Sequence, residues 1–233
     1  LRNAGQNGGA VLSGAWDAAS AEISASTFIG NVATAGDGGA IEAAGTLSVT
    51  GSEFSANTAY GGVGGAIDSW ACYSDCVSLS GNRFVDNEAA DGGAVHAYGG
   101  GTTSIGDTFE RNSATSGDGG AIFTEHRLDL TGGSFTGNTA AWSGGAIYAG
   151  LDTTVTGSTF TGGAGVSGGA IFTQSGDLSV IESDFTANTA TGYGGAICTD
   201  LGTVSATGGS FIGNSADSGG AIFSGANASI TGG

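Results

Sequence analysis

The chain has no lysine and only four arginines, against 21 aspartates and glutamates, so its net charge is −17. Nucleic acids and anionic lipid surfaces bind proteins through clusters of Lys and Arg, and so acidic a chain is disfavoured as a direct partner of either. We therefore expect no nucleic-acid partner and no direct insertion of this segment into a membrane. The plainest interpretation of the charge is a solvated surface that repels other acidic surfaces.

Proline is absent too, and the composition argues against two further classes of chain. With 49 glycines and many Ser, Thr and Asn residues, the sequence lacks the helical periodicity of ankyrin and tetratricopeptide arrays, so helical repeats are disfavoured. Glycine and proline together stay below the roughly 25–30% that marks disordered low-complexity chains. All eleven phenylalanines also fall into two fixed columns of a repeat, which a disordered chain does not need.

Cysteine is scarce, and two of the three residues lie close together. Cys72 and Cys76 fall in the connection from Ile67 to Phe84, which spans 17 residues where most such connections span 13 or 14. A local disulfide that staples this long connection is the leading interpretation, and it would fit an oxidising compartment. The spacing permits the bond without establishing it. A zinc site is disfavoured because no histidine lies nearby.

What the chain does have is a tetrapeptide, Gly-Gly-Ala followed by Ile or Val, that recurs nine times at intervals of 24 to 30 residues. Its copies begin at Gly8, Gly38, Gly64, Gly92, Gly119, Gly144, Gly168, Gly194 and Gly219. Between the copies runs a second series, Phe-x-x-Asn, in which one member, Phe160, is followed by Gly163 instead of Asn. A period near 25 residues is that of a solenoid, in which each repeat forms one coil.

Short alternating stretches, such as Leu47-Ser48-Val49 and Leu178-Ser179-Val180, are typical of strands. We predict three short strands per coil: the tetrapeptide strand, a Leu/Val strand and a strand that carries the Phe. Variation in length is confined to a loop between the Asn and the next Gly-Gly pair, because a slip elsewhere would turn inward side chains outward. The fold predicted for residues 1–233 is a single all-β domain, a right-handed parallel β-helix of about eight to nine coils.

Stacked coils should place equivalent side chains in ladders along the rod. One inward ladder is predicted for Phe28, Phe54, Phe84, Phe109, Phe135, Phe160, Phe185 and Phe211. A second, structural ladder of amides that satisfy turn backbone groups is predicted for Asn31, Asn57, Asn87, Asn112, Asn138, Asn188 and Asn214. Gly163 interrupts the amide ladder, so we expect a weaker coil between Asn138 and Asn188, with faster amide exchange than its neighbours.

The position directly after the tetrapeptide Ile or Val varies and is expected to face solvent. Four of the last five coils carry an aromatic residue there, and we expect them to form an exposed apolar stripe that binds a partner: Phe123, Tyr148, Phe172 and Phe223. The alternative is that such a stripe is covered by another part of the parent protein or serves only to stabilise the rungs. Cys198 occupies the same column and is expected to be an unpaired, partly exposed thiol. Loop aromatics could extend the recognition surface: Trp16, Trp70 and Trp142.

The paired motifs carry a family resemblance. Phe54-Ser55-Ala56-Asn57 followed by Gly64-Gly65-Ala66-Ile67 resembles the repeats of the chlamydial polymorphic outer-membrane proteins and related bacterial surface proteins. The resemblance implies the β-helical passenger of an autotransporter-type surface protein with a role in adhesion. It also implies an extracellular or cell-surface location. The sequence holds no signal peptide and no transmembrane barrel segment, so we expect it to be a segment of a longer surface protein.

Sites for metals and for catalysis are not predicted. Aspartates before the Gly-Gly pairs, such as Asp37, Asp91 and Asp118, do not cluster within one turn, and the nonapeptide of calcium-binding β-rolls is missing. Arg83, Arg111 and Arg127 lie at different repeat positions, and so do His96 and His126, which makes a catalytic constellation improbable. No cofactor is expected.

Three functions stay open from the sequence. The first is a non-enzymatic adhesive or structural surface rod, whose partner is a protein or glycan on another surface. The second is the subunit of an extracellular fibre, in which further copies dock end to end because the repeat pattern has no caps. The third is a polysaccharide-active β-helix enzyme, a lyase or a glycosidase. We expect the first.

Overall fold

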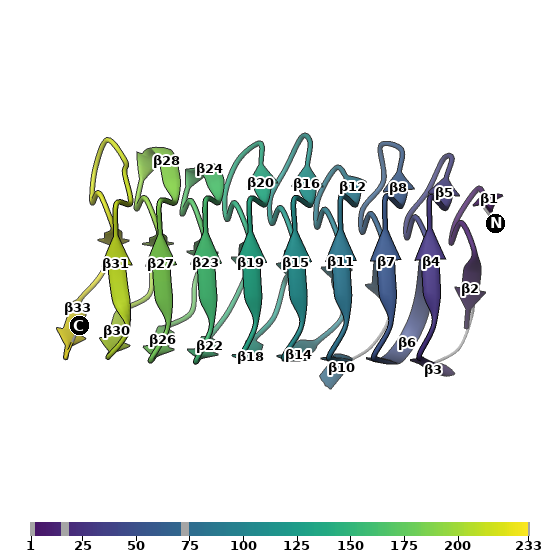
Figure 1. Cartoon of the computed structure of the whole chain (residues 1–233), viewed down its shortest axis with the longest axis horizontal. Coiled ribbons are helices and arrows are strands. Elements are labelled where there is room, and N and C mark those ends of the chain that lie inside the picture. Colours follow the sequence, from purple (N-terminus) through teal and green to yellow (C-terminus); the bar gives the residue numbers. More distant parts are fainter. Residues whose placement is uncertain (1–2, 15–18, 71–74, 233) are drawn as a thin grey trace.

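A computed structural model of the chain describes residues 3–14, 19–70 and 75–232. These residues form a parallel β-solenoid of about eight turns with no helix. The coils lie side by side along a rod, with the two ends of the chain at opposite ends of it (Figure 1). The parallel β-helix predicted from the repeats is therefore confirmed. No described segment forms a helix of the length and apolarity that a membrane span requires.

The strands that carry the Phe residues form one sheet, here called the Phe sheet, with eight parallel strands. They are β4 (Thr27–Ile29), β7 (Glu53–Ser55), β11 (Arg83–Val85), β15 (Thr108–Glu110), β19 (Ser134–Thr136), β23 (Thr159–Thr161), β27 (Asp184–Thr186) and β31 (Ser210–Ile212). Figure 1 shows this sheet in front, with one strand per coil. Each Phe pairs in register with the Phe of the next coil.

The tetrapeptide strands and the Leu/Val strands belong to one sheet of 17 strands, because β6 (Ile41–Thr50) runs through the corner between them. The other tetrapeptide strands are β2 (Val11–Ser13), β9 (Ile67–Trp70), β13 (Val95–Ala97), β17 (Ile122–Thr124), β21 (Ile147–Ala149), β25 (Ile171–Thr173), β29 (Ile197–Thr199) and β32 (Ile222–Ser224). The other Leu/Val strands are β3 (Ala19–Ser24), β10 (Asp75–Ser80), β14 (Gly101–Ile105), β18 (Leu128–Thr131), β22 (Thr153–Thr156), β26 (Leu178–Ile181), β30 (Val204–Thr207) and β33 (Ala228–Thr231).

A fourth strand position corrects the prediction of three strands per coil. Directly after the Asn or its equivalent, a short strand pairs with the next coil in a separate sheet of eight strands. These strands are β1 (Ala4–Gly5), β5 (Val32–Ala33), β8 (Thr58–Ala59), β12 (Glu88–Ala89), β16 (Ser113–Ala114), β20 (Thr139–Ala140), β24 (Ala164–Ser167) and β28 (Thr189–Tyr193). Extended pairing there satisfies backbone groups that would otherwise be buried without partners. The loop of variable length begins after this strand.

The Phe residues fill the core as a continuous column of rings. Their centroids are 4.7–5.0 Å apart and their planes differ by 2–9°, so every ring stacks on the next. The tetrapeptide Ile and Val side chains and the Leu/Val strands pack against the same core. The spacing is that of hydrogen-bonded strands, so the rings are held in contact by the backbone rungs.

The amides form a second column at the corner beside the Phe sheet. In the middle of the rod, the backbone N and Nδ2 of Asn112 donate to Oδ1 of Asn138 at 2.9 and 3.0 Å. Nδ2 of Asn112 also donates to the carbonyl oxygen of Phe84, at 3.1 Å. Each amide thus links its own coil to the coils on both sides, which is the chemistry expected of a structural ladder.

At Gly163 the ladder loses one amide but keeps a hydrogen bond, because the backbone N of Gly163 donates to Oδ1 of Asn188 at 2.9 Å. A Cβ at this position would lie 2.4 Å from the carbonyl oxygen of Gly169, so the backbone here leaves no room for a side chain. The adjacent strands β24 and β28 are longer than most of their equivalents. Faster amide exchange in this coil stays a prediction.

The Gly-Gly pairs have a steric cause. The first glycine of every pair has φ between 51° and 66°, which is the left-handed region that side chains disfavour. At the second glycine the coils approach closely. A Cβ on Gly120 would lie 2.1 Å from the carbonyl oxygen of Gly145 and 2.5 Å from that of Thr139. Both contacts are with backbone atoms, which cannot move aside. The second glycine is therefore required by the close approach of neighbouring coils.

Candidate functional site

One side chain per coil follows the tetrapeptide Ile or Val and points away from the core; we call this row the outer column. Its members pair in register from coil to coil: Leu12, Glu42, Asp68, His96, Phe123, Tyr148, Phe172, Cys198 and Phe223. The column therefore changes along the rod from carboxyl and imidazole groups to aromatic rings. It contains all four residues that the sequence predicts to bind a partner.

The prediction that these aromatic residues form an exposed stripe is wrong. Phe123 and Tyr148 are each only 8% exposed, and Phe172 and Phe223 are half-buried. The rings of Phe123 and Tyr148 stack at 4.7 Å with a 2° angle between planes, and Tyr148 stacks on Phe172 at 5.4 Å. Each ring therefore covers the faces of its neighbours, which leaves mainly ring edges toward solvent.

Side chains from both flanks complete the cover. On one side, Oη of Tyr148 donates to Oε1 of Gln174, which comes from the next coil, at 2.8 Å. On the other side, the loop residue Tyr193 packs against Phe223, with centroids 4.8 Å apart. The outer column therefore lies beneath the side chains of the flanking loops. We call the outer column together with these flanking side chains the layered face.

Cys198 also departs from its prediction. The thiol is free, as predicted, but the residue is buried instead of partly exposed. Burial, with a contribution from the Asp200 carboxylate, raises the pKa of the Cys198 thiol to about 12. The thiolate is the reactive form of cysteine, so this side chain behaves as a small apolar residue at neutral pH.

The polar half of the outer column is a row of three titratable groups in consecutive coils: Glu42, Asp68 and His96. All three are buried. Nδ1 of His96 and Oδ1 of Asp68 form a hydrogen bond of 2.7 Å, and the imidazole stacks on Phe123 at 4.9 Å. The sequence prediction that this position faces solvent missed the row. The only indication of this row in the sequence is that all three residues directly follow the tetrapeptide Ile or Val.

Glu42 is held on one side only. Its Oε1 accepts hydrogen bonds from Nε1 of Trp70 at 3.2 Å and from Nδ2 of Asn7 at 3.5 Å, whereas Oε2 is buried without a partner. Burial, followed by the charge of Asp68, raises the pKa of the Glu42 carboxyl above its usual range. Burial also raises the pKa of Asp68, and the hydrogen bond with His96 opposes that shift. Burial therefore disfavours the ionised forms of the Glu42 and Asp68 carboxyls.

We expect Glu42→Gln to stabilise the protein at pH 7 by about 1–3 kcal/mol, because the neutral amide removes the desolvation cost of a buried negative charge near Asp68. A carboxyl whose pKa is raised in the folded state contributes its full stability below its unfolded pKa, and that contribution is lost as the pH rises through the folded pKa. The wild type should therefore lose stability between pH 4 and pH 7 relative to the variant. Urea unfolding at both pH values measures this difference. Glu22→Gln, an exposed matched control, should change little, and a variant that is less stable than wild type at pH 7 would contradict the argument.

Three exposed apolar residues of this face lie on one flank of the outer column, in loops that precede Gly-Gly pairs. Trp142, Val166 and Tyr193 are 63%, 46% and 49% exposed and come from three successive coils. We call these three residues the loop ridge. Ser143 bridges Ser167, and Ser167 pairs with Tyr193, so the three loops run in parallel. Among the loop tryptophans of the sequence prediction, Trp70 and Trp142 are exposed, and Trp16 lies outside the described residues.

Carboxylates surround the aromatic residues of the outer column. Burial and then the charges of four acidic residues raise the pKa of Tyr148 to about 12: Asp118, Glu125, Asp91 and Asp200. Oδ1 of Asp118 accepts a hydrogen bond of 2.6 Å from the backbone N of Ser143, next to Trp142. Acidic groups therefore stand on both flanks of the column and directly beside the loop ridge.

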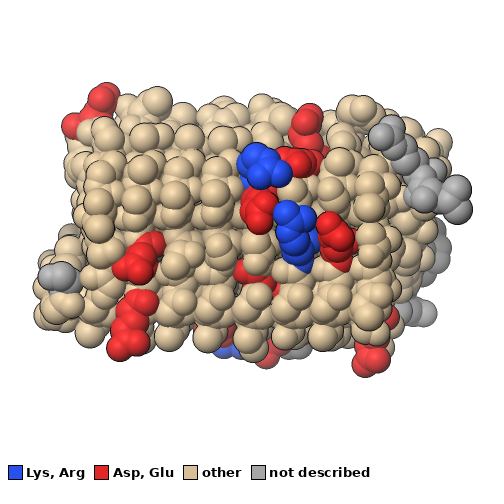
Figure 2. Space-filling model, in the orientation of Figure 1, with Lys and Arg blue, Asp and Glu red and all other residues tan. Residues whose placement is uncertain are grey.

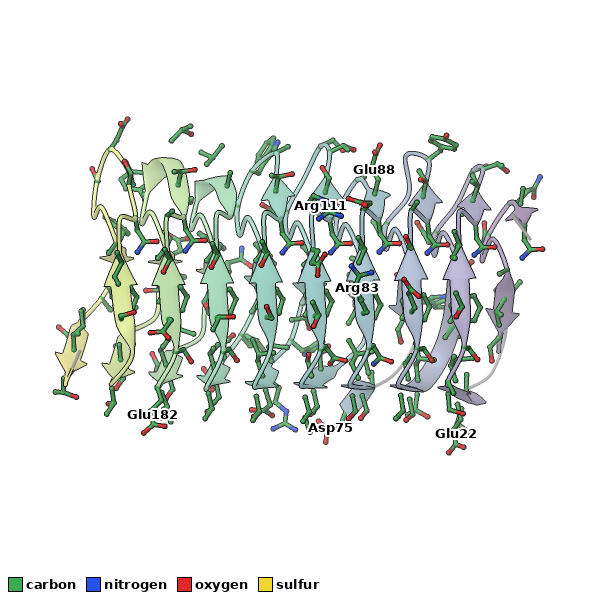
Figure 3. The ribbon with its side chains drawn as sticks, in the orientation of Figure 1. Glu22, Asp75, Arg83, Glu88, Arg111 and Glu182 are labelled. Atoms are coloured by element: carbon green, nitrogen blue, oxygen red, sulfur yellow. The ribbon has the colours of Figure 1, made fainter. Side chains whose placement is uncertain are left out.

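The three described arginines, Arg83, Arg111 and Arg127, are all paired. Arg83 bonds Glu53 and Glu110 at 3.3 and 3.0 Å, and Arg111 forms a two-point ion pair with Asp86 at 2.8 and 3.0 Å. Both belong to the Phe-sheet side of the rod, where Figure 3 labels them and Figure 2 shows the positive charges among carboxylates. Arg127 contacts Asp75 and Asp129. The three arginines are thus occupied in exposed ion pairs.

The turn aspartates have a backbone role. Oδ1 of Asp37 accepts a hydrogen bond from the backbone N of Val63 at 2.8 Å, and Oδ1 of Asp91 accepts one from the backbone N of Asp118 at 2.7 Å. Each carboxylate thus caps the loop of the following coil. Across residues 3–14, 19–70 and 75–232, no three His, Cys, Asp or Glu side chains are grouped so as to hold a metal ion.

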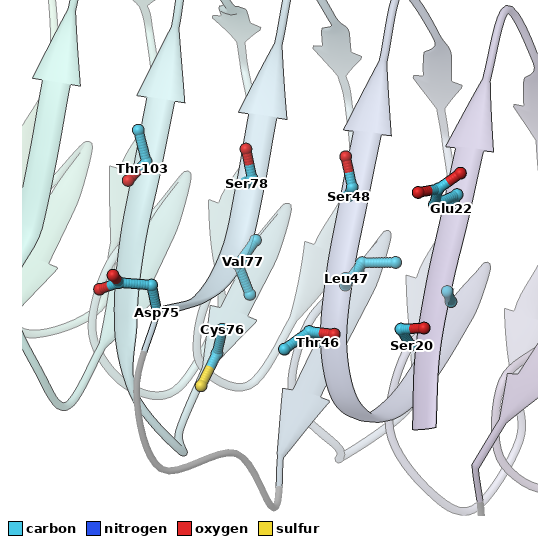
Figure 4. A pocket seen from close by; sticks show the side chains of 11 residues that line it. Ser20, Glu22, Thr46, Leu47, Ser48, Asp75, Cys76, Val77, Ser78 and Thr103 are labelled. Atoms are coloured by element: carbon cyan, nitrogen blue, oxygen red, sulfur yellow. The ribbon is translucent and has the colours of Figure 1, made fainter. Parts of the chain in front are cut away.

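A pocket of about 310 Å³ lies on the outer side of the Leu/Val strands near the N-terminal end (Figure 4). Hydroxyl groups such as those of Ser48, Ser78 and Thr103 line it, with Glu22 and Asp75 at its margins. Cys76 also lines this pocket, and its predicted disulfide partner Cys72 lies outside the described residues. No acid, base and nucleophile converge there, so we assign the pocket no chemistry.

The fold and its ladders define a parallel β-solenoid repeat protein. Three of its coils match the sequence model of the Chlamydia polymorphic membrane protein repeat, at residues 108–125, 132–150 and 182–200. Each matched segment contains one Phe-x-x-Asn and one Gly-Gly-Ala-Ile motif, and the coil with Gly163 lies between the second and third. Comparison with curated proteins and with solved structures found no match.

Proposed function

We propose that this chain is a non-enzymatic passenger or stalk of a bacterial surface protein, located outside the cell, and that it presents the layered face of the tetrapeptide sheet for adhesion. The repeat family is named for a membrane protein of Chlamydia, which supports a surface location. A rod of stacked coils also suits a structure that carries binding residues away from a membrane.

The observation that carries the adhesive part is the loop ridge. Trp142, Val166 and Tyr193 are exposed on three successive coils, and exposed aromatic residues that lie together mark contact surfaces in soluble proteins. The aromatic residues of the outer column support the ridge from below. The proposed partner-binding surface therefore shifts from Phe123 and Tyr148 to the loops beside them.

Catalysis is not proposed. The outer column brings Asp68 and His96 together, but both are buried, and the described arginines are taken up by carboxylates. A polysaccharide enzyme of this fold needs convergent acids or a basic group in an open groove.

Adhesion of coated beads tests the proposal. Beads that carry the chain should adhere to cultured epithelial cells above the level of albumin-coated beads. The double variant Trp142→Ala/Tyr193→Ala should reduce adhesion by about tenfold, since exposed aromatic anchors dominate binding energy at such sites. Ile29→Ala/Ile212→Ala is a matched control, because both residues are exposed apolar side chains on the Phe sheet. Adhesion no greater than that of albumin would overturn the proposed function.

A further inference from the structure

We infer that the loop ridge and the carboxylates around it bind a cationic, arginine- and lysine-rich segment of a partner protein. This inference rests on the proposed function, because it names the class of partner that the adhesive face recognises. It depends on three features of the same face: an exposed aromatic ridge, carboxylates without ion pairs, and a rigid support.

The ridge carries two exposed aromatic residues, Trp142 and Tyr193, with Val166 on the rung between them. The backbone N of Ser167 donates to the carbonyl oxygen of Trp142 at 3.3 Å, which fixes the two loops on adjacent rungs. Ser167 in turn pairs with Tyr193, which sets the third loop beside the second. Trp142 and Tyr193 are thus two rungs apart, about 10 Å at the usual strand spacing. A guanidinium or ammonium group over either ring gains cation–π attraction, and tryptophan is the best acceptor.

The carboxylates on this face make no ion pair within the described part of the chain, although one oxygen of Asp91 and one of Asp118 each accept a backbone hydrogen bond. Asp91 and Asp118 precede the ridge, and Asp217 stands next to Ser218, which bridges Tyr193. Glu125 and Asp200 are exposed on the opposite flank of the outer column. None of these five carboxylates takes part in an ion pair within the described part of the chain, whereas the described arginines are paired on other faces.

Charge complementarity therefore selects a basic occupant. With a net charge of −17, the chain repels phosphates and acidic polysaccharides, and its acidic flanks favour Lys and Arg near the ridge. Arginine fits best, because its planar guanidinium stacks on aromatic rings and bonds carboxylates through two N–H groups at once. A neutral glycan would use the rings without the carboxylates.

The support is rigid, so the surface is formed before the partner arrives. Tyr193 leans on Phe223 with a ring angle of 52°, and the loop of Trp142 is tied to Asp118 through Ser143. Binding to such a surface loses little entropy from ordering the protein, which favours short, charged peptide segments.

A labelled octa-arginine peptide is the probe, titrated against the whole chain by fluorescence anisotropy at about 0.1 M salt, where charges more than about 10 Å apart are screened. Trp142→Ala/Tyr193→Ala and Glu125→Gln/Asp200→Asn should each weaken binding about tenfold. Octa-lysine should bind the wild type more weakly than octa-arginine, and the difference should become smaller in Trp142→Ala/Tyr193→Ala, where only the carboxylates still favour arginine. All four residues are exposed, and circular dichroism verifies that each variant is folded.

The matched control is Glu22→Gln/Glu182→Gln, which removes the same charge from the edge of the rod that carries the Leu/Val strands (Figure 3). It should change affinity less than twofold. Equal losses of affinity in the control and in Glu125→Gln/Asp200→Asn would show that the peptide responds only to the overall negative charge of the chain, and the inference would fail. Loss in the aromatic variant alone would show that the carboxylates take no part in binding and would also overturn it.

The two proposals fail separately. If coated beads adhere and octa-arginine neither binds at the ridge nor competes with adhesion, the adhesive function stands and the cationic partner is wrong. If octa-arginine binds at the ridge and the beads do not adhere, the site stands and the adhesive function is wrong.

Discussion

Phe109→Ala should destabilise the rod by about 3–5 kcal/mol, the range measured for buried aromatic side chains replaced by alanine. The ring of Phe109 is completely buried and stacks on both sides, on Phe84 at 4.8 Å and on Phe135 at 4.7 Å. Its removal leaves a cavity that the hydrogen-bonded rungs cannot close, because their spacing is set by the backbone. Urea denaturation followed by circular dichroism gives the change in unfolding free energy.

The position of Phe109 adds a second signature. In a solenoid each coil contacts only its neighbours, so a weak interface in the middle uncouples the two halves. The single unfolding transition should broaden or split. Phe211→Ala is the matched control, because Phe211 is half-buried and stacks on Phe185 alone among the described rings. Its loss should be less than half as large, and equal losses at both sites would show that the ring column does not act as a continuous support.

Asn112→Ala should cost about 3 kcal/mol or more, because several buried groups lose their partners together. Oδ1 of Asn112 accepts hydrogen bonds from the backbone N of Asn87 at 3.1 Å and from its Nδ2 at 3.0 Å. Nδ2 of Asn112 donates to Asn138 and to the carbonyl of Phe84. Alanine leaves these groups without water or protein to replace the bonds. Native-state amide exchange at Asn87 and thermal unfolding both report the loss.

Asn112→Asp keeps the shape of the side chain but removes its Nδ2 donor, so it tests the donor role alone. The carboxylate can still accept from Asn87, but it cannot donate to Phe84 or Asn138, so its ionised form is disfavoured. Its pKa should be raised in the folded state, and the variant should be more stable at pH 4 than at pH 7. Asn214→Ala, at a half-buried amide with equivalent bonds, should lose less because water can replace the missing partner. A variant Asn112→Asp as stable as wild type at pH 7 would remove the donor role.

The ladders could be predicted from the sequence because the number of residues per coil alone determines which side chains lie above one another. Phe84, Phe109 and Phe135 recur at nearly constant spacing, and stacked coils must then superpose their rings. The amides follow in the same way, since each Asn stands three residues after its Phe. The outline of the fold follows from these two columns.

The rest depends on contacts that periodicity does not encode. A two-residue strand such as Ser113–Ala114 is too short to show any alternation, so the fourth strand position was missed. Alternation correctly places Phe123 and Tyr148 outside the core, but it does not say what covers them. The cover over Tyr148 comes from Gln174, one coil further along. The pair of Asp68 and His96 was missed for the same reason, because each occurs once in its column.

The amide column also gives the rod a direction. Along Asn57, Asn87 and Asn112, the bonds between amides all run from one coil to the following coil, whereas each Nδ2 also donates to a Phe carbonyl of the preceding coil. At these junctions the amide oxygen therefore always belongs to the following coil, and the amide nitrogen that bonds it belongs to the preceding coil. A coil inserted backwards would place donors against donors, which leaves both unpaired. A coil added by gene duplication can therefore pair with its neighbours in one orientation only. In that orientation it can fit at any junction whose loops allow it.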